Sequence, residues 1–204
     1  NNGTGQGDDY FLYRGTVDRR FAVLPYDLDT ILDQGDTRGK VEDGLFRMNA
    51  NPVIARLMTH PEFAPVYYAT LTRLIETTFA SATFDSLVDR TLSGLVPNPQ
   101  IEGMSAFAAA RRDFVLSQIP RRISVSNELA VVNGYARATQ NPVALRGAAN
   151  AVRTRAVHVN GQAAGWSAWT GTWSIETLAL QPGVNRVLIQ AFDGLGQEFE
   201  RSWV

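Results

Sequence analysis

The stretch Asp9-Tyr10-Phe11-Leu12-Tyr13, followed after a polar turn by Leu24-Pro25-Tyr26-Asp27-Leu28-Asp29, decides the fold of the N-terminal half. Two short apolar runs separated by polar residues predict a pair of strands over residues 9–29. Residues two apart in a strand point to the same face, so we expect Asp27 and Asp29 to present their carboxylates side by side. Such carboxylates repel each other unless a cation or hydrogen-bond donors lie between them. The pair is therefore a candidate metal site.

Two other interpretations of this acidic region stay open on the residues alone. The carboxylates of Asp27 and Asp29 can cap the turn that follows a strand. Asp33 and Asp36 add oxygen ligands of the kind that Ca²⁺ prefers, although their spacing differs from that of an EF-hand loop.

Composition excludes several classes of function. A chain of 204 residues can bury one sizeable core or two modest ones. The net charge of −1 provides no electrostatic basis for binding nucleic acid or an anionic membrane surface. No apolar run approaches the roughly 20 residues of a membrane span. The absence of cysteine excludes disulfides and thiolate metal sites.

Residues 51–130 have a helical hydrophobic period and predict an antiparallel helical block. Asn51-Pro52 is typical of a helix start, and a second helix is expected after His60-Pro61. A third is expected to begin near Ser81 or Thr83. The fourth is expected from about Ser105 to Ile119, with a continuation from Arg121 to Leu129 beyond Pro120.

Residues 135–204 predict a small antiparallel β-sandwich, because short β patterns alternate there with turn signals such as Asn160-Gly161. The expected strands cover residues 143–145, 157–159, 173–180, 187–192 and 199–204. The predicted fold class is α+β, with a β-hairpin and a helical block over residues 1–130 followed by the sandwich over residues 135–204. The glycine-rich start at residues 1–7 is typical of an internal loop, so we expect this chain to be a piece of a longer protein.

The two N-terminal motifs resemble the signature of the CotH (spore-coat protein H) kinase-like family. That family typically has Asn-Tyr-Tyr-Leu-Tyr, a short hairpin and then Ile-Pro-Trp-Asp-Leu-Asp. The helical block is similar in order, with Asn51-Pro52, then Pro61-Glu62-Phe63 ahead of Tyr67-Tyr68, and an expected final helix that carries Arg121 and Arg122. The resemblance covers about residues 1–130.

The resemblance implies part of an atypical protein-kinase-like domain that binds ATP and Mg²⁺ and phosphorylates secreted or surface proteins of bacteria, including coat proteins. It places Asp27 and Asp29 at the family's metal-binding Asp-x-Asp and Asp9 at the Asn of the first motif. Carboxylate oxygens are the ligands that Mg²⁺ prefers, together with substrate phosphates. Phosphoryl transfer then depends mainly on positioning and charge neutralisation.

Two departures from the family pattern affect the expected activity. The family's catalytic aspartate stands a few residues before the first motif, where this chain offers Asp8 as an off-register substitute. The ATP-facing lobe, with its lysine and glutamate, would lie upstream, and Lys40 cannot replace that lysine. We therefore expect this chain alone to be inactive as a kinase.

The C-terminal part resembles the Ig-like or fibronectin-like modules of bacterial surface proteins, through patterns such as Val157-His158-Val159-Asn160-Gly161. Trp173 is expected in its core. Trp166 and Trp169 are the candidates for a surface platform that would contact glycan or cell wall.

Two functions are therefore carried forward. The first is a fragment of a secreted or surface CotH-like kinase that transfers the γ-phosphoryl group of ATP to protein side chains with Mg²⁺. The alternative is a non-enzymatic cell-surface or adhesion protein, in which a degenerate kinase-like scaffold carries an Ig-like binding module. A hydrolase that uses Asp27 and Asp29 is less favoured, because two residues on one strand face are too alike to divide acid and base roles.

Overall fold

The structure is a computed structural model of the chain, and it describes residues 10–26, 28, 31–35, 39–127 and 129–204. It contains helices and antiparallel sheets, which confirms the predicted α+β class. The chain divides into two compact units: residues 1–58 with 70–118, and residues 59–69 with 119–204. The domain limits that the sequence predicts, 1–130 and 135–204, stay a prediction.

The first unit begins with an antiparallel hairpin of β1 (Tyr10–Arg14) and β2 (Phe21–Pro25), as the alternating motif predicts. Its turn is stabilised by Asp18, whose carboxylate accepts hydrogen bonds from the backbone N–H of Arg20 at 3.0 Å and from that residue's guanidinium at 2.6 Å. Gly15 allows the turn to close, since a Cβ there would lie 2.9 Å from the carbonyl oxygen of Asp18.

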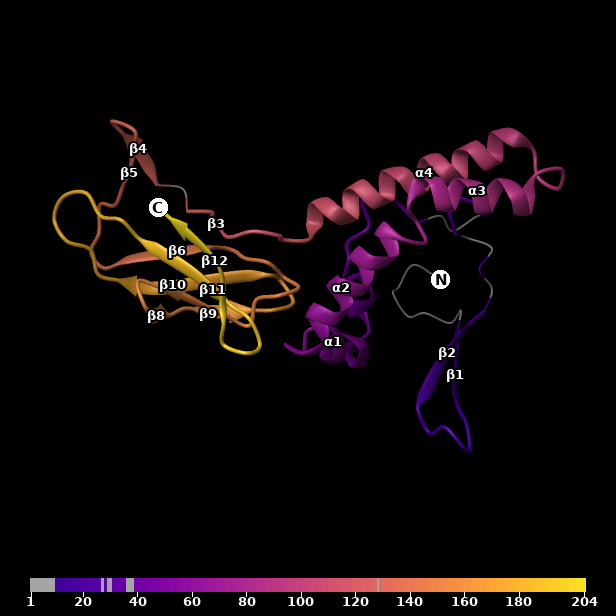
Figure 1. Cartoon of the computed structure of the whole chain (residues 1–204), viewed down its shortest axis with the longest axis horizontal. Helices are drawn as coiled ribbons and strands as arrows, with labels where there is room; N and C mark the ends of the chain where they lie inside the picture. Colours follow the sequence, from indigo (N-terminus) through magenta and orange to yellow (C-terminus); the bar gives the residue numbers. More distant parts are fainter. Residues whose placement is uncertain (1–9, 27, 29–30, 36–38, 128) are drawn as a thin grey trace. The chain divides into compact units, whose positions relative to one another are not determined.

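Four α-helices and a short 3₁₀ helix follow the hairpin, and Figure 1 shows α3 beside α4. Their bounds are η1 (Arg47–Ala50), α1 (Pro52–Met58), α2 (Phe63–Glu76), α3 (Ser81–Leu92) and α4 (Asn98–Gln118). The side chain of Asn51 caps α1 by accepting from the N–H groups of Val53 and Ile54, as predicted. Residues of α2 up to Ala69 belong to the second unit and the later ones to the first.

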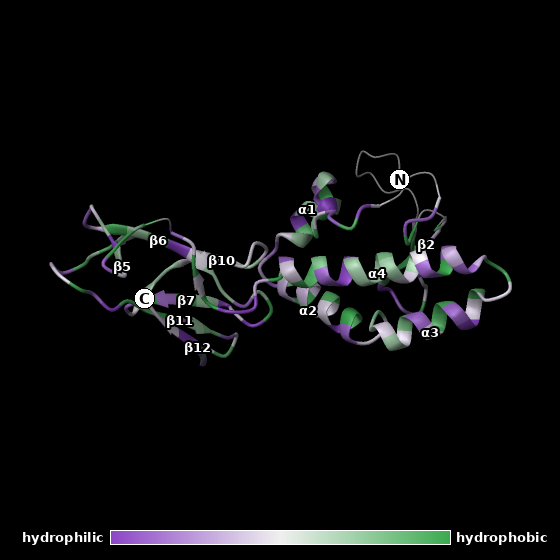
Figure 2. Ribbon diagram, turned by 90° about the horizontal axis from the view of Figure 1, so that it is seen from above, coloured by the Kyte–Doolittle hydropathy of each residue, from purple (hydrophilic) through white to green (hydrophobic). Residues whose placement is uncertain are grey.

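The core of the first unit lies between α3 and α4. Phe84 and Val88 of α3 are buried against Ile101 and Ala108 of α4. Figure 2 shows hydrophobic and hydrophilic residues alternating along both helices. In α3 the hydrophobic residues Phe84 and Val88 lie on one face, as expected for a helix that buries one side.

Two features of the last helix differ from the prediction. Helix α4 begins at Asn98 rather than near Ser105, because Pro99 occupies its first turn, where a missing N–H costs little. The predicted continuation from Arg121 to Leu129 is wrong: α4 ends at Gln118, and β3 (Ser124–Val125) pairs with β6 (Val143–Ala148) instead. Pro120 cannot donate the hydrogen bond that would extend the helix.

The second unit contains two four-stranded antiparallel sheets, with strand orders β3-β6-β10-β9 and β12-β11-β7-β8. Its further strands are β7 (Ala156–Val159), β8 (Gln162–Ala163), β9 (Gly165–Ser167), β10 (Thr172–Leu178), β11 (Leu188–Phe192) and β12 (Glu198–Trp203). Every second residue along β7 and β11 turns inward, and β10 follows the same pattern up to Ile175, where its register shifts. Val157, Trp173 and Ile189 form the centre of the core. The five predicted strands are thus confirmed.

A separate hairpin projects from this unit in Figure 1. Its strands β4 (Ala130–Val132) and β5 (Tyr135–Arg137) pair with each other around Asn133-Gly134. Both turn residues have positive φ, 52° and 82°, as a two-residue hairpin turn requires. The sequence prediction missed this hairpin because it assigned Asn133-Gly134 to a domain boundary.

Gly147 provides a test of how closely β3 and β6 approach. A Cβ at Gly147 would lie 1.8 Å from the backbone oxygen of Ser124, whereas a Cβ at Gly165 would meet nothing nearer than 3.5 Å. We expect Gly147→Ala to lower the free energy of unfolding by about 2–3 kcal/mol, because backbone must move. Gly165→Ala is the matched control, with a change below about 1 kcal/mol, and urea unfolding measures both. Equal effects of the two substitutions would contradict the close approach.

Candidate functional site

Most of the described residues of the two sequence motifs lie on the hairpin β1–β2, and the strand register determines which of these residues are paired. Tyr10 pairs with Pro25 at the open end of the hairpin, and Arg14 pairs with Phe21 at the turn end. The candidate catalytic residues Asp8 and Asp9 precede Tyr10 in the sequence. They lie outside the described residues.

The candidate metal ligands Asp27 and Asp29 also lie outside the described residues. The described strand β2 ends at Pro25, so the alternation argument for this pair does not extend directly from it. Asp36, the second half of the calcium alternative, is outside the described residues as well. Within the part of the chain that the structure describes, no three His, Asp or Glu residues gather as a metal site would require.

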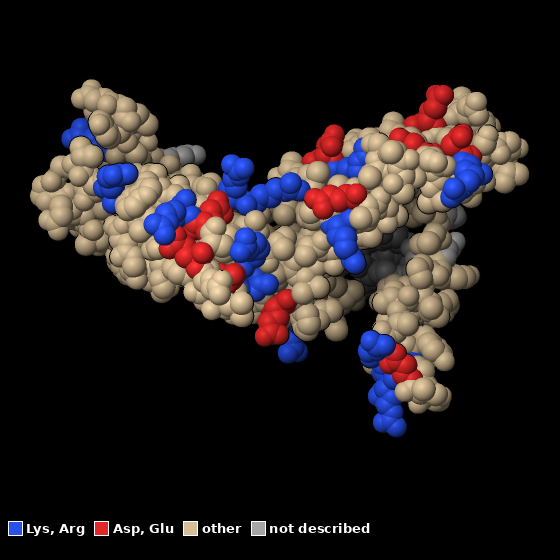
Figure 3. All heavy atoms as spheres, viewed as in Figure 1, with Lys and Arg blue, Asp and Glu red and all other residues tan. Residues whose placement is uncertain are grey.

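Apolar side chains of the hairpin are exposed on both of its faces. The residues concerned are Phe11, Leu12, Tyr13, Phe21, Val23 and Leu24, with exposed fractions between 47% and 66%. Figure 3 shows charged side chains gathered at the turn end of the hairpin, while the rest of it is uncharged. An uncharged surface of this kind is typical of a region that another segment or ligand covers.

Aromatic contact orders the open end of the hairpin. The ring of Phe11 meets the ring of Tyr26 edge to face, with 5.3 Å between ring centroids. Tyr26 is the residue directly before Asp27. The second motif is therefore fixed to β1 by side-chain packing as well as by the strand register.

The loop that follows the Asp-x-Asp pair has an unusual backbone. Leu32 and Asp33 both have positive φ, 55° and 62°, in a region that non-glycine residues seldom occupy. Packing offsets this cost, because Leu32 lies against the α3/α4 core. The Gln34 side chain donates to the Leu32 carbonyl at 3.2 Å. Strained backbone is frequent at functional loops, although strain alone does not identify a function.

Arg111 of α4 binds the backbone of the chain at residues 41–43, which follow the loop. Its Nη1 donates to the backbone oxygens of Val41 and Asp43, each at 2.5 Å. Arg112, its neighbour, instead donates to the Phe79 carbonyl at 2.7 Å and to the Ser81 hydroxyl at 2.6 Å. These bonds attach the connection between α2 and α3, and the first residue of α3, to α4. Sequence reasoning missed both roles, since it looked to Arg121 and Arg122, which lie beyond the end of α4.

The carboxylate of Asp43 is held by two hydrogen bonds. It accepts from the backbone N–H of Lys40 at 3.0 Å and from the Arg47 guanidinium at 2.6 Å. The Lys40 hydrogen bond is the main reason that the pKa of Asp43 is held below its usual 3.8, and the positive charges of Arg47 and Arg111 lower it further. At the hairpin turn, the Arg20 side chain likewise lowers the pKa of Asp18.

The tryptophans of the second unit have different positions. Trp173 is buried, as expected, and its indole N–H donates to the Ala148 carbonyl at 3.0 Å. Trp166 is half-buried and packs against the sandwich core, while Trp169 is 38% exposed. The Trp169 carbonyl accepts from the hydroxyl of Tyr68 at 2.6 Å, and burial raises the pKa of that hydroxyl to about 12.

Comparison with protein-family models supports the resemblance that the two N-terminal motifs indicate. The family model described as "CotH kinase protein" matches residues 1–103 of the chain. This chain belongs to the CotH kinase protein family. The match contains the hairpin β1–β2, the acidic region and the helices through the start of α4. No curated protein and no solved structure matches the chain.

The CotH match ends before the sandwich, so the Ig-like or fibronectin-like assignment of the second unit stays a prediction. Membership of the family supports a kinase-like protein and, in general terms, ATP with Mg²⁺ and a protein substrate. No helix in the described part of the chain has the length and apolar character needed to cross a membrane.

The Arg111 hydrogen bonds yield a stability prediction. We expect Arg111→Ala to lower the free energy of unfolding by about 2 kcal/mol, because two backbone carbonyls lose a charged donor. Arg90→Ala, an exposed arginine on α3, is the control and should change it by less than about 0.5 kcal/mol. Urea unfolding measures the difference, and equal values for the two variants would refute the assigned role.

Asp43 yields a prediction about pH. Its pKa is lower in the folded chain than in the unfolded one, so its stabilising effect is present above pH 3.8 and is lost as the pH falls below that value. We expect Asp43→Asn to be less stable than the unmodified chain by about 1 kcal/mol at pH 7. The two should converge as the pH falls from 4 toward 2. A difference that stays constant over this range, measured by urea unfolding, would contradict the prediction.

Proposed function

We propose that this chain is part of a secreted or cell-surface bacterial kinase of the CotH family, which transfers the γ-phosphoryl group of ATP to a hydroxyl group of a surface or coat protein. One observation carries the proposal: the chain's two family motifs flank the open end of one hairpin, where Tyr10 pairs with Pro25. Asp9 precedes the first of these residues by one position, and Asp27 follows the second by two. The register therefore favours a site to which both motifs contribute.

In this proposal Asp27 and Asp29 hold Mg²⁺, since a pair of carboxylates is a donor set that suits this ion. Bound there, Mg²⁺ would neutralise charge on the phosphates of ATP. Asp8 or Asp9 accepts the proton of the substrate hydroxyl, whose oxygen forms the new bond to the γ-phosphorus. The bond from that phosphorus to the β–γ bridging oxygen breaks, and ADP leaves with the electron pair.

The described surroundings support a site built for positioning. Packing of Leu32 and the hydrogen bonds of Arg111 fix two points of the chain that follows the Asp-x-Asp pair. Phosphoryl transfer depends on such fixed geometry more than on covalent chemistry. The exposed apolar surface of β1–β2 is where an ATP-facing lobe would pack.

The test compares Asp27 and Asp29 with an aspartate of α3 in the full product of the gene that encodes this chain. We expect Asp27→Ala and Asp29→Ala to lower the rate of phosphoryl transfer from ATP by at least about 100-fold, because charge at the transferring group is no longer neutralised. Asp85→Ala, at an exposed position of α3, is the control and should retain activity within about twofold. Radiolabelled ATP measures transfer, and calorimetry measures whether binding of ATP still requires Mg²⁺.

Two results would overturn the proposal. Undiminished transfer by Asp27→Ala would remove the assigned metal role. Absence of any transfer and of Mg²⁺-dependent ATP binding by the full product would favour the alternative, a non-enzymatic surface protein with a kinase-like scaffold.

A further inference from the structure

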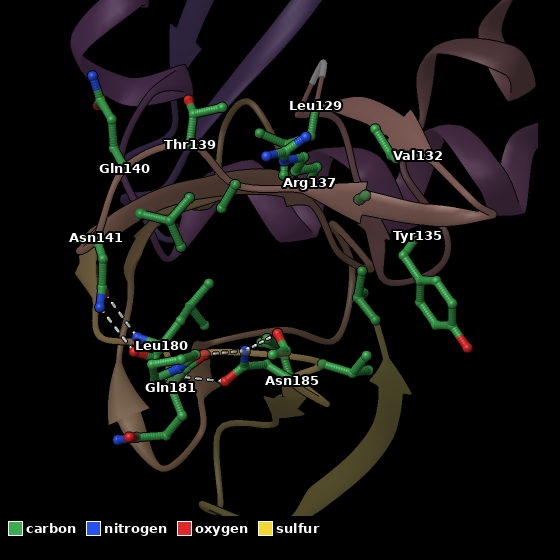
Figure 4. A pocket seen from close by; sticks show the side chains of 18 of the residues that line it. Leu129, Val132, Tyr135, Arg137, Thr139, Gln140, Asn141, Leu180, Gln181 and Asn185 are labelled. Atoms are coloured by element: carbon green, nitrogen blue, oxygen red, sulfur yellow. Dashed lines mark hydrogen bonds between the residues drawn. The ribbon is translucent and has the colours of Figure 1, made fainter.

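One end of the β-sandwich contains a cavity of about 800 Å³. Figure 4 shows its two walls, with Leu129 and Arg137 on the side of the β4–β5 hairpin and Asn141, Leu180 and Asn185 on the opposite side. All of its lining residues belong to the second unit. The volume lies in the range of small-molecule sites, roughly 300–1,000 Å³.

The inner surface of the cavity is apolar. It is formed by the aliphatic side chains of Leu129, Val143, Leu145, Leu180 and Val187, which also belong to or pack against the sandwich core. Figure 4 shows the amide groups of Gln140 and Gln181 directed away from the centre of the cavity. An alkyl chain is therefore a better match to this interior than a sugar, which needs several hydrogen-bonding groups.

The wall opposite the hairpin is preformed, and its asparagines use their amides internally. Asn141 donates to the Leu180 carbonyl at 2.8 Å and accepts from that residue's N–H at 3.0 Å. Asn185 accepts from the Gln181 N–H at 2.9 Å and donates to its carbonyl at 2.8 Å. Each asparagine thus uses both its amide nitrogen and its amide oxygen within the wall, and these bonds fix the wall before any ligand arrives.

Arg137 is the one charged side chain among the described residues that line the cavity. It lies at the end of β5 and is exposed, and its guanidinium makes no hydrogen bond or ion pair with the described part of the chain. A guanidinium beside an apolar cavity provides a bidentate partner for a carboxylate. The positive charge therefore favours an apolar ligand that has an anionic group at one end.

We propose that this cavity binds a medium-chain alkyl carboxylate, with the alkyl chain between the two walls and the carboxylate on Arg137. The site is independent of the phosphoryl-transfer site proposed for the first unit. The β4–β5 hairpin forms the wall nearest the carboxylate, and its strands pair with each other rather than with either four-stranded sheet.

Calorimetry tests whether the cavity binds the alkyl chain. The whole 204-residue chain is titrated with octanoate, decanoate and dodecanoate, each below its micelle concentration. We expect affinity to rise about fourfold with each added methylene. Decanol, which lacks the charge, should bind about tenfold more weakly than decanoate.

Substitutions test whether Arg137 binds the carboxylate. Arg137→Gln should weaken decanoate binding about tenfold and leave decanol binding unchanged. Arg146→Gln is the matched control, since this exposed arginine lies on β6 outside the cavity lining and should leave both affinities unchanged. Arg137 is exposed, so its substitution is not expected to unfold the chain.

Three results would overturn the proposal. They are no binding of any carboxylate at millimolar concentration, equal affinity for decanol and decanoate, and equal effects of Arg137→Gln and Arg146→Gln on decanoate.

Discussion

The pairing of Tyr10 with Pro25 is the constraint on which the candidate site depends. A shift of the register by one residue would turn every side chain of one strand to the other face, and would separate the contact of Phe11 with Tyr26. The hairpin buries little of its own apolar surface, so a two-stranded unit of this kind gains little stability by itself. Its register is supported by the turn, where Asp18 binds Arg20, and by the aromatic contact at the open end.

The acidic region depends on the helical block for its shape. Leu32 reaches the α3/α4 core, and Arg111 binds the backbone at Val41 and Asp43. Both interactions join residues that are far apart in sequence, which explains why a loop with two positive φ values can hold one conformation. The described part of this loop, residues 31–35, is therefore held by contacts from the helical block.

The second unit has a filled core and one open end. Inward residues of its two sheets fill a core around Trp173, while the end bounded by β4–β5 and the 181–185 loop stays open. Along that end the side chains of Asn141 and Asn185 bind backbone groups of Leu180 and Gln181. An open end of this kind is where sandwich proteins can acquire binding sites without disturbing the core.

The sequence by itself determined the hairpin, the order of the helices and most of the sandwich strands, because periods of 2 and 3.6 residues and turn pairs such as Asn160-Gly161 are local signals. It also indicated the CotH family through the two motifs that the family match covers. The tertiary structure decided the course after Pro120, where pairing of β3 with β6 replaced a helix. It also decided the partners of Arg111 and the position of Arg137 beside a cavity. A contact across 70 residues, or a place beside a cavity, depends on packing that no local pattern contains.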